Sequence, residues 1–229
     1  MQTQIATAPY RIHRYPTQLI ESWDLRNGTR ATLRPVLPQD DVSEQAFVAD
    51  LSPASRRNRF HGAVNGLSAV RAEAMTNIDY RSHMGFVVTV MEGDNERVIA
   101  DARYVMNEEG DSAEFAVVVA DAWHGLGLGR RLISALCKCA RSAGARWLCG
   151  EVLAGNRDML LLMDRCGFAA RPHPADEALI KVERSVVEPG RTPAPAKRAN
   201  SVFGILSLSV AQWMRPQRRA AALDDLSVR

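Results

Sequence analysis

The sequence contains no stretch approaching the ~20 consecutive apolar residues that a membrane-spanning helix requires. Its first 14 residues contain no apolar run of the secretory type, so we expect a cytoplasmic protein. Cysteine is scarce, with four in 229 residues, and none of them has Cys-x-x-Cys spacing. We therefore expect neither a metal site nor a redox pair, and interpret the cysteines as small buried hydrophobes.

Two common phosphate-binding motifs are also missing. No Gly-Lys-Ser/Thr triplet occurs, which excludes a P-loop. A dinucleotide fingerprint, Gly-x-Gly-x-x-Gly, would need a third glycine where the chain has Arg130 or Leu132. The glycine-rich segment between residues 125 and 129 is therefore typical of neither a nucleoside triphosphate site nor a dinucleotide site.

What is present is a Val-rich run over residues 115–119, a turn with three alternate glycines (Gly125, Gly127 and Gly129), and an amphipathic helix that begins with Arg130 and Arg131. A strand, a glycine turn and a helix N-terminus together form a binding site for anions, because backbone N–H groups converge there and the helix dipole is positive. The alternative is an ordinary turn between a core strand and a core helix.

The segment His124-Gly125-Leu126-Gly127-Leu128-Gly129 resembles the acyl-CoA-binding signature of the GNAT acetyltransferase superfamily, Gln/Arg-x-x-Gly-x-Gly/Ala after a Val-rich strand. His124 replaces the usual Gln or Arg and can still donate a hydrogen bond. The resemblance covers roughly residues 28–184. It implies an α/β GNAT fold with a mixed central sheet, whose parallel fourth and fifth strands splay apart around the pantetheine arm of acetyl-CoA.

Hydrophobic periodicity predicts the order β-α-α-β-β-β-α-β-α-β. The expected strands cover residues 29–36, 84–91, 98–106, 113–119, 146–153 and 178–182, and the expected helices cover 39–51, 67–78, 128–141 and 156–166. Residues 55–62 between the first two helices are expected to form a basic loop. Short turns make the second to fourth strands antiparallel, whereas the helix after the fourth strand requires the fifth to be parallel to it.

We divide the chain into an N-terminal arm (1–27), the GNAT domain (28–184), a Pro-rich linker (185–200) and a basic C-terminal segment (201–229). The net charge of +3 is uneven, because residues 185–229 hold seven Lys/Arg and three Asp/Glu, or +4, which leaves −1 for the rest. A nucleic-acid partner is therefore not expected. The C-terminal segment could form a basic amphipathic helix that docks on a membrane or partner, or could pack on its own domain or a dimer mate. The protein is expected to be a monomer or a homodimer.

Acetyl transfer from a thioester to an amine requires a neutral amine, although a lysine with a pKa of ~10.4 is protonated at neutral pH. Glu114 lies in an otherwise apolar strand, where burial would raise the pKa of a carboxyl group. Strand alternation puts Glu114, Ala116 and Val118 on one face, but the sequence does not show whether that face is the cleft or solvent. In the lysine acetyltransferases that this chain resembles, a Glu in the Glu-Phe-Ala-Val-Val-Val context is the general base, which implies that role for Glu114.

The resemblance also implies a set of cofactor-binding residues. Backbone groups of the valines would bind the oxyanion and pantetheine, the glycine turn would bind phosphate, and Asn156 would cap its helix and contact the cofactor. The set is Val117, Val118, Val119, His124, Gly125, Leu126, Gly127, Leu128, Gly129, Arg130, Arg131 and Asn156. Both arginines could equally be solvated helix residues.

Many GNAT enzymes carry a Tyr as general acid four residues before a Gly-Phe pair, and here that position is Met163. A thiol pKa of ~8.5 makes the thiolate a fair leaving group unaided, and Glu114 or a water could supply the proton. In the predicted basic loop, Arg56, Arg57 and Arg59 could recognise acidic residues around a target lysine or pair with the domain's own carboxylates.

The sequence therefore predicts an acetyl-CoA-dependent N-acetyltransferase. The resemblance to bacterial protein-lysine acetyltransferases implies a lysine acceptor, for instance on an acyl-CoA synthetase. The alternatives are a small-molecule amine acetyltransferase of the same fold and a non-catalytic acyl-CoA-binding sensor.

Overall fold

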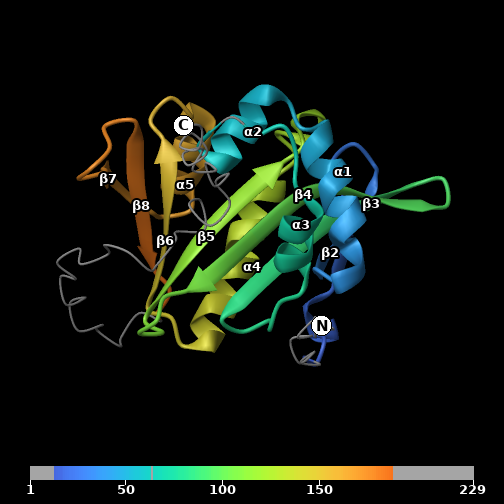
Figure 1. Cartoon of the computed structure of the whole chain (residues 1–229), viewed down its shortest axis with the longest axis horizontal. Coiled ribbons are helices and arrows are strands. Elements are labelled where there is room, and N and C mark those ends of the chain that lie inside the picture. Colours follow the sequence, from blue (N-terminus) through green and yellow to red (C-terminus); the bar gives the residue numbers. More distant parts are fainter. Residues whose placement is uncertain (1–12, 63, 188–229) are drawn as a thin grey trace, which may run out of the picture.

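The computed structural model describes residues 13–62 and 64–187, which form one mixed sheet with five α-helices (Figure 1). The sheet has eight strands in the order β1-β2-β3-β4-β5-β6-β8-β7. The strands are β1 Glu21–Asp24, β2 Arg30–Pro35, β3 His83–Glu92, β4 Asn95–Met106, β5 Ser112–Val119, β6 Trp147–Leu153, β7 Ala169–Pro172 and β8 Leu179–Ser185. The helices are α1 Asp41–Asp50, α2 Pro53–Phe60, α3 Ala69–Thr76, α4 Leu128–Ala143 and α5 Arg157–Arg165. The predicted α/β class is confirmed.

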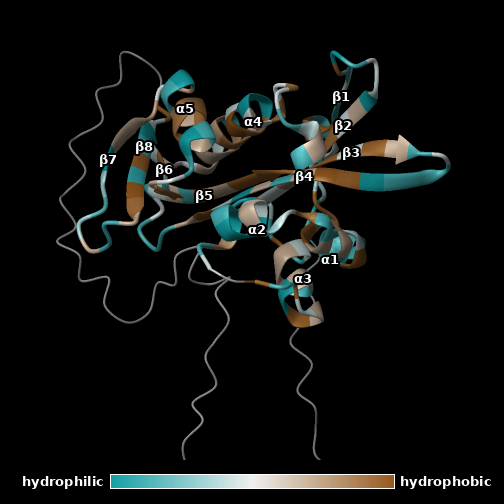
Figure 2. Ribbon diagram, turned by 90° about the horizontal axis from the view of Figure 1, so that it is seen from above, coloured by the Kyte–Doolittle hydropathy of each residue, from teal (hydrophilic) through white to brown (hydrophobic). Residues whose placement is uncertain are grey.

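The helices cover the sheet in two layers. Figure 2 shows α4 and α5 on one side of the sheet and α1, α2 and α3 on the other. The α4 side buries the larger apolar cluster, in which Leu132, Leu136 and Ala140 form the predicted stripe along α4. The smaller cluster lies under α1 to α3 and includes Phe47, Phe60 and Val118. Burial of apolar side chains on both faces stabilises the sheet.

Hairpins connect β3 to β4 and β4 to β5, and these strands pair antiparallel as predicted. The crossover through α4 makes β6 parallel to β5, which is also confirmed. Ser68 caps α3 by accepting a hydrogen bond from the Arg71 backbone, and Gly144 ends α4 with a φ of 106°. Serine at an N-cap and glycine at the C-terminal end are typical of α-helices.

The structure corrects the predicted elements at three places. The prediction of a loop over residues 55–62 is wrong, because α2 begins at Pro53 with Ser52 as its N-cap. The expected N-terminal arm contains a strand, β1, which pairs antiparallel with β2, and Leu25 after it is buried. A further short strand, β7, pairs with β8. The predicted basic C-terminal segment lies outside the described residues, as does the linker from residue 188 onward.

Candidate functional site

The parallel strands β5 and β6 pair over a short distance and then separate. Their register covers Ser112, Ala113 and Glu114 opposite Trp147, Leu148 and Cys149. At the point of separation the Phe115 ring packs on Gly150, where an added Cβ would lie 2.9 Å from Phe115 Cε1. The predicted splaying of these strands is therefore present, and it begins immediately after Glu114.

The peptide groups of β5 beyond Glu114 point alternately to its two neighbours. Ala120 N, directly after β5, donates to Ile99 O of β4, and Trp147 N donates to Asp111 O on the β6 side. Strand alternation therefore directs the peptide groups of Phe115, Val117 and Val119 toward the opening. Val118 instead faces β4 with its backbone and buries its side chain. Of the three valines predicted to bind cofactor, Val117 and Val119 have peptide groups on the side of the opening.

The glycine turn leads from β5 into α4. Gly125 and Gly127 have φ values of 75° and 84°, a left-handed conformation that favours glycine. Gly127 is the N-cap of α4, and no side chain caps the helix there. The first N–H groups of α4, which include those of Leu128 and Gly129, are thus available to an anion. Gly129 serves close packing, since an added Cβ would lie 2.8 Å from Leu162 Cδ2 of α5.

Two of the predicted side chains at the turn, His124 and Arg131, make polar contacts with other parts of the structure. The exposed His124 places Nε2 2.9 Å from Val119 O and so closes the loop between β5 and the turn, with Leu126 half-buried behind it. Arg131 donates to Glu21 of β1 at 3.0 Å, and its guanidinium lies 4.1 Å from the centroid of the Trp23 ring. Arg130 is exposed. Of the two arginines, Arg131 is thus held by β1, a strand that sequence reasoning missed.

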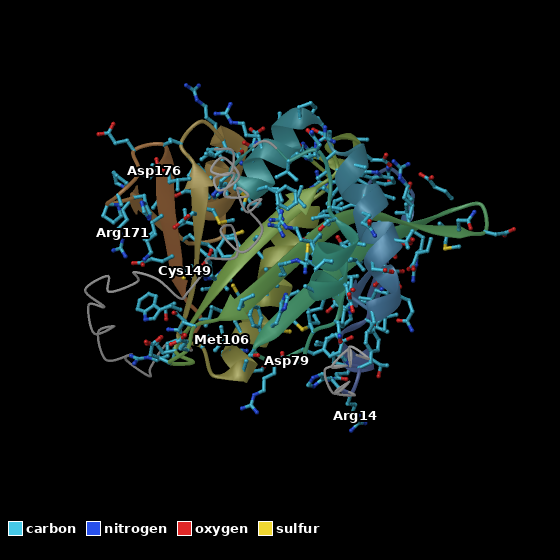
Figure 3. All side chains as sticks on the ribbon, viewed as in Figure 1. Arg14, Asp79, Met106, Cys149, Arg171 and Asp176 are labelled. Atoms are coloured by element: carbon cyan, nitrogen blue, oxygen red, sulfur yellow. The ribbon has the colours of Figure 1, made fainter. Side chains whose placement is uncertain are left out.

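Glu114 is half-buried at the vertex of the opening. Its register partners are Val105 on β4 and Cys149 on β6, so its side chain lies on the face that α1 to α3 cover. Burial, followed by the nearby charge of Glu114, raises the pKa of the Cys149 thiol to about 12. Cys149 (Figure 3) is therefore a neutral thiol beside a carboxylate and not a nucleophile.

The predicted residues on α5 are both in the positions expected. Asn156 caps the helix, with Oδ1 accepting from Met159 N at 3.2 Å. Met163 is completely buried in the apolar cluster under α4 and α5. A thioether cannot donate a proton, so a general acid has to come from another residue or from water.

A group of four buried charges under α1 to α3 was not predicted. Asp101 on β4 accepts hydrogen bonds from Arg59 of α2 at 3.1 Å and from Arg103, which also donates to Met75 O at 2.8 Å. Glu44 of α1 lies 3.6 Å from Arg103, and neither of its oxygens has a hydrogen-bond partner within the described part of the chain. Burial, followed by the charge of Asp101, raises the pKa of Glu44 to about 8. We call these residues the buried charge group.

The three arginines of α2 could either recognise acidic residues of a substrate or pair with carboxylates of their own domain, and the structure answers this for one of them. Arg59 is paired with a carboxylate of its own domain. Arg56 donates to Ala49 O at 2.7 Å, near the end of α1. Arg57 is the exposed arginine of this helix. The signal available in the sequence was the alternation of Asp101 and Arg103 within an otherwise apolar strand.

The described residues contain neither a cluster of metal-ligating side chains nor a membrane-spanning helix. No group of three or more His, Cys, Asp or Glu side chains is arranged to hold a metal ion. Within the same residues, every helix is too short or too polar to cross a bilayer.

Comparison with known proteins agrees with this geometry. Residues 57–168 match the Acetyltransferase (GNAT) family. The chain is 34% identical over 161 residues to acetyltransferase PA5475 of Pseudomonas aeruginosa, a match that covers 70% of this chain and 86% of that protein. It is also 34% identical over 144 residues to acetyltransferase Pat of Mycolicibacterium smegmatis, covering 62% of this chain and 42% of that protein.

Solved structures of acyltransferases also superimpose on this chain. The GNAT domain of S. lividans PAT superimposes with a TM-score of 0.67 at 26% identity, covering 75% of this chain and 99% of that one. A cAMP-binding acyltransferase from Mycobacterium smegmatis superimposes with a TM-score of 0.51 at 28% identity, covering 75% of this chain and 49% of that one. The splayed parallel strands, the glycine turn and these matches show that the chain is an acyltransferase that belongs to the GNAT acetyltransferase family.

Proposed function

We propose that this enzyme transfers the acetyl group of acetyl-CoA directly to the amine of a protein lysine, with Glu114 as the general base. The observation that carries the proposal is the position of Glu114 at the last residue pair before β5 and β6 separate. The Glu114 carboxyl group projects from β5, the same strand whose peptide groups line the opening. A base and an oxyanion donor are thus adjacent on one strand.

Each chemical requirement has a candidate group in this arrangement. Glu114, directly or through one water, takes a proton from the lysine ammonium and leaves a nucleophilic amine. The amine attacks the thioester carbonyl, and the N–H of Val117 donates to the oxyanion. The attacking nitrogen then releases its second proton to water and the C–S bond breaks, which gives the amide. The thiolate leaves without Met163 and takes a proton from Glu114 or water. The N–H groups at the start of α4, with Arg130, bind the phosphates.

The choice of a protein lysine rests on the resemblance of the Glu-Phe-Ala-Val-Val-Val strand to that of lysine acetyltransferases. A small-molecule amine is the second candidate acceptor. The buried Met163, in place of a proton-donating Tyr, is the observation that favours a non-catalytic acyl-CoA sensor.

The test replaces Glu114 with Gln, which keeps the shape and removes the base. We expect Glu114→Gln to lower kcat ~10²-fold while the dissociation constant of acetyl-CoA changes little. Release of CoA would be followed with lysine peptides and with polyamines, so that the same assay identifies the acceptor class. Isothermal titration of acetyl-CoA would report binding separately.

Glu151→Gln is the matched control, because Glu151 lies on the same face of β6 as Cys149 and pairs with His173 at 3.4 Å. We expect this variant to keep wild-type turnover within about twofold. Equal turnover in wild type and Glu114→Gln would reject Glu114 as the base. Acetyl-CoA binding without turnover on any amine would favour the sensor instead.

A further inference from the structure

One carboxylate joins the loop that leads into the glycine turn to the first residues of α2. Asp121 accepts hydrogen bonds from Ser52 N at 3.1 Å, from Ser52 Oγ at 2.8 Å and from Ser55 Oγ at 2.8 Å. Burial alone would raise the pKa of Asp121, but the hydrogen bonds from Ser52 and Ser55 bring that pKa below its ordinary value. The carboxylate is therefore ionised at neutral pH, when charge-assisted bonds are strongest.

A hollow of about 360 Å³ lies beside this connection, lined among others by Phe47, Ser52, Asp121 and Trp123. Partner atoms for dispersion contacts are missing on the side of the hollow, so the three hydrogen bonds contribute strongly to the link between the loop and the start of α2. Removal of a single side chain can therefore separate the two elements.

Asp121 is close to the glycine turn both along the chain and in space. Residues Asp121–Trp123 form a single 3-10 turn directly after β5. Trp123 N donates to Ala120 O, His124 N donates to Asp121 O, and the His124 ring contacts Val119 O. This small loop is closed on itself, so a displacement at Gly125 moves Asp121 with it.

The other partner, α2, lies on the face of the sheet from which the Glu114 side chain projects. It packs against β5 (Figure 1), where Phe60 and Val118 share one apolar cluster. Its C-terminal turn is held to β4 through the pair of Arg59 with Asp101. The N-terminal end of α2 thus follows the cofactor loop, whereas its C-terminal end is anchored in the sheet.

We propose that Asp121 is a positioning residue that transmits cofactor binding at the glycine turn to α2. This inference rests on the proposed function, because it takes the turn to be the cofactor site. Ordering of the turn by the cofactor fixes Asp121, and Asp121 in turn fixes Ser52, Ser55 and the first turn of α2. The first turn of α2 is therefore held more firmly when the cofactor is present.

The test is hydrogen–deuterium exchange of the full chain with and without acetyl-CoA. In wild type we expect the cofactor to slow exchange at least threefold, both at residues 124–131 and in α2 at residues 53–60. In Asp121→Ala the turn should still be protected, whereas the protection of α2 should be lost. A purely structural role would raise exchange in α2 equally with and without the cofactor.

Ser55→Ala provides a milder variant that keeps both bonds from Ser52, and it should retain part of the protection of α2. Asp24→Asn is the matched control, because Asp24 is an exposed carboxylate of β1 that pairs with Arg30 at 3.2 Å, and it should behave as wild type. Protection of α2 that persists in Asp121→Ala, or that is absent from wild type when the turn is protected, would overturn the inference. Absence of protection at the turn itself would instead reject the cofactor site of the proposed function.

Discussion

The two faces of the sheet are held to their helices by different interactions. On the α4 and α5 face the contact is mainly apolar, with Leu132, Ile133 and Leu136 completely or almost completely buried. On the α1 to α3 face the apolar cluster is smaller and contains the buried charge group. Apolar packing is non-directional, whereas ion pairs require particular positions of both partners. Apolar packing therefore holds α4 and α5 to the first face, whereas ion pairs help to fix the positions of the three short helices on the second face.

The helices on the two faces also differ in what stabilises them. Helix α4 has 16 residues and a continuous apolar stripe, whereas α2 has eight residues, of which three are arginines. A helix as short as α2 is not stable by itself in water. It depends on Ser52 and Asp121 at its start and on Arg59 and Asp101 near its end.

The largest effect should come from breaking the buried charge group. Arg103→Met removes one of the two arginines that pair with Asp101, together with its hydrogen bond to Met75 O, and so breaks the buried network. We expect a loss of about 3–5 kcal/mol of unfolding free energy, measured by urea denaturation. Arg97→Met is the control on the same strand, since Arg97 pairs with Glu92 at the surface, and it should cost under ~1 kcal/mol. Similar losses from both variants would mean that the buried charge group contributes no more to stability than an exposed ion pair.

The pH dependence of Glu44 gives a second, smaller test. Since burial raises the pKa of Glu44 to about 8 from 4.5, the folded protein retains a proton that the unfolded chain releases. That contribution to stability is present below pH 4.5 and is lost as the pH rises toward 8. Relative to Glu44→Gln, wild type should therefore lose up to about 4 kcal/mol between pH 5 and pH 9 in isothermal denaturation. A constant difference would show that Glu44 is ionised throughout as a partner of Arg103, with Arg59 and Asp101 completing the charge balance.

The smallest effect concerns the apolar face at the vertex of the opening. Gly150→Ala would place a Cβ 2.9 Å from the Phe115 ring, which has to shift within a packed core. We expect a cost of about 1–2 kcal/mol in unfolding free energy. Gly155→Ala, with no atom within 4 Å of the added Cβ, is the matched control and should be close to neutral. If Gly150→Ala were equally neutral, the packing of Phe115 would not be what fixes the separation of β5 and β6.

The features predicted correctly from sequence depend on local signals. The glycine spacing, the strand before it and the stripe of α4 are all contained within residues 112–143. The crossover rule then makes β6 parallel to β5 without any knowledge of packing. Local periodicity and connection length were therefore sufficient for the arrangement of the central strands.

The features that were missed depend on distant partners. Helix α2 has no apolar stripe, so periodicity does not identify it, although Ser52 followed by Pro53 is a typical helix start. Strand β1 has four mostly exposed residues and forms by pairing with β2. Because β1 was not predicted, Glu21 could not be foreseen as the partner of Arg131. The buried charge group likewise joins residues from α1, α2 and β4 that only the folded chain brings together.

The short ladder between β5 and β6 divides the sheet into a block of five strands and a block of three. Hydrogen bonds between the blocks end soon after Glu114, although β5 and β6 both continue beyond it. A molecule that lies in the opening and bonds both to the peptide group of Val117 and to β6 would bridge the two blocks. Such a ligand would hold the two blocks together while it is bound, and this connection would be lost when the ligand dissociates.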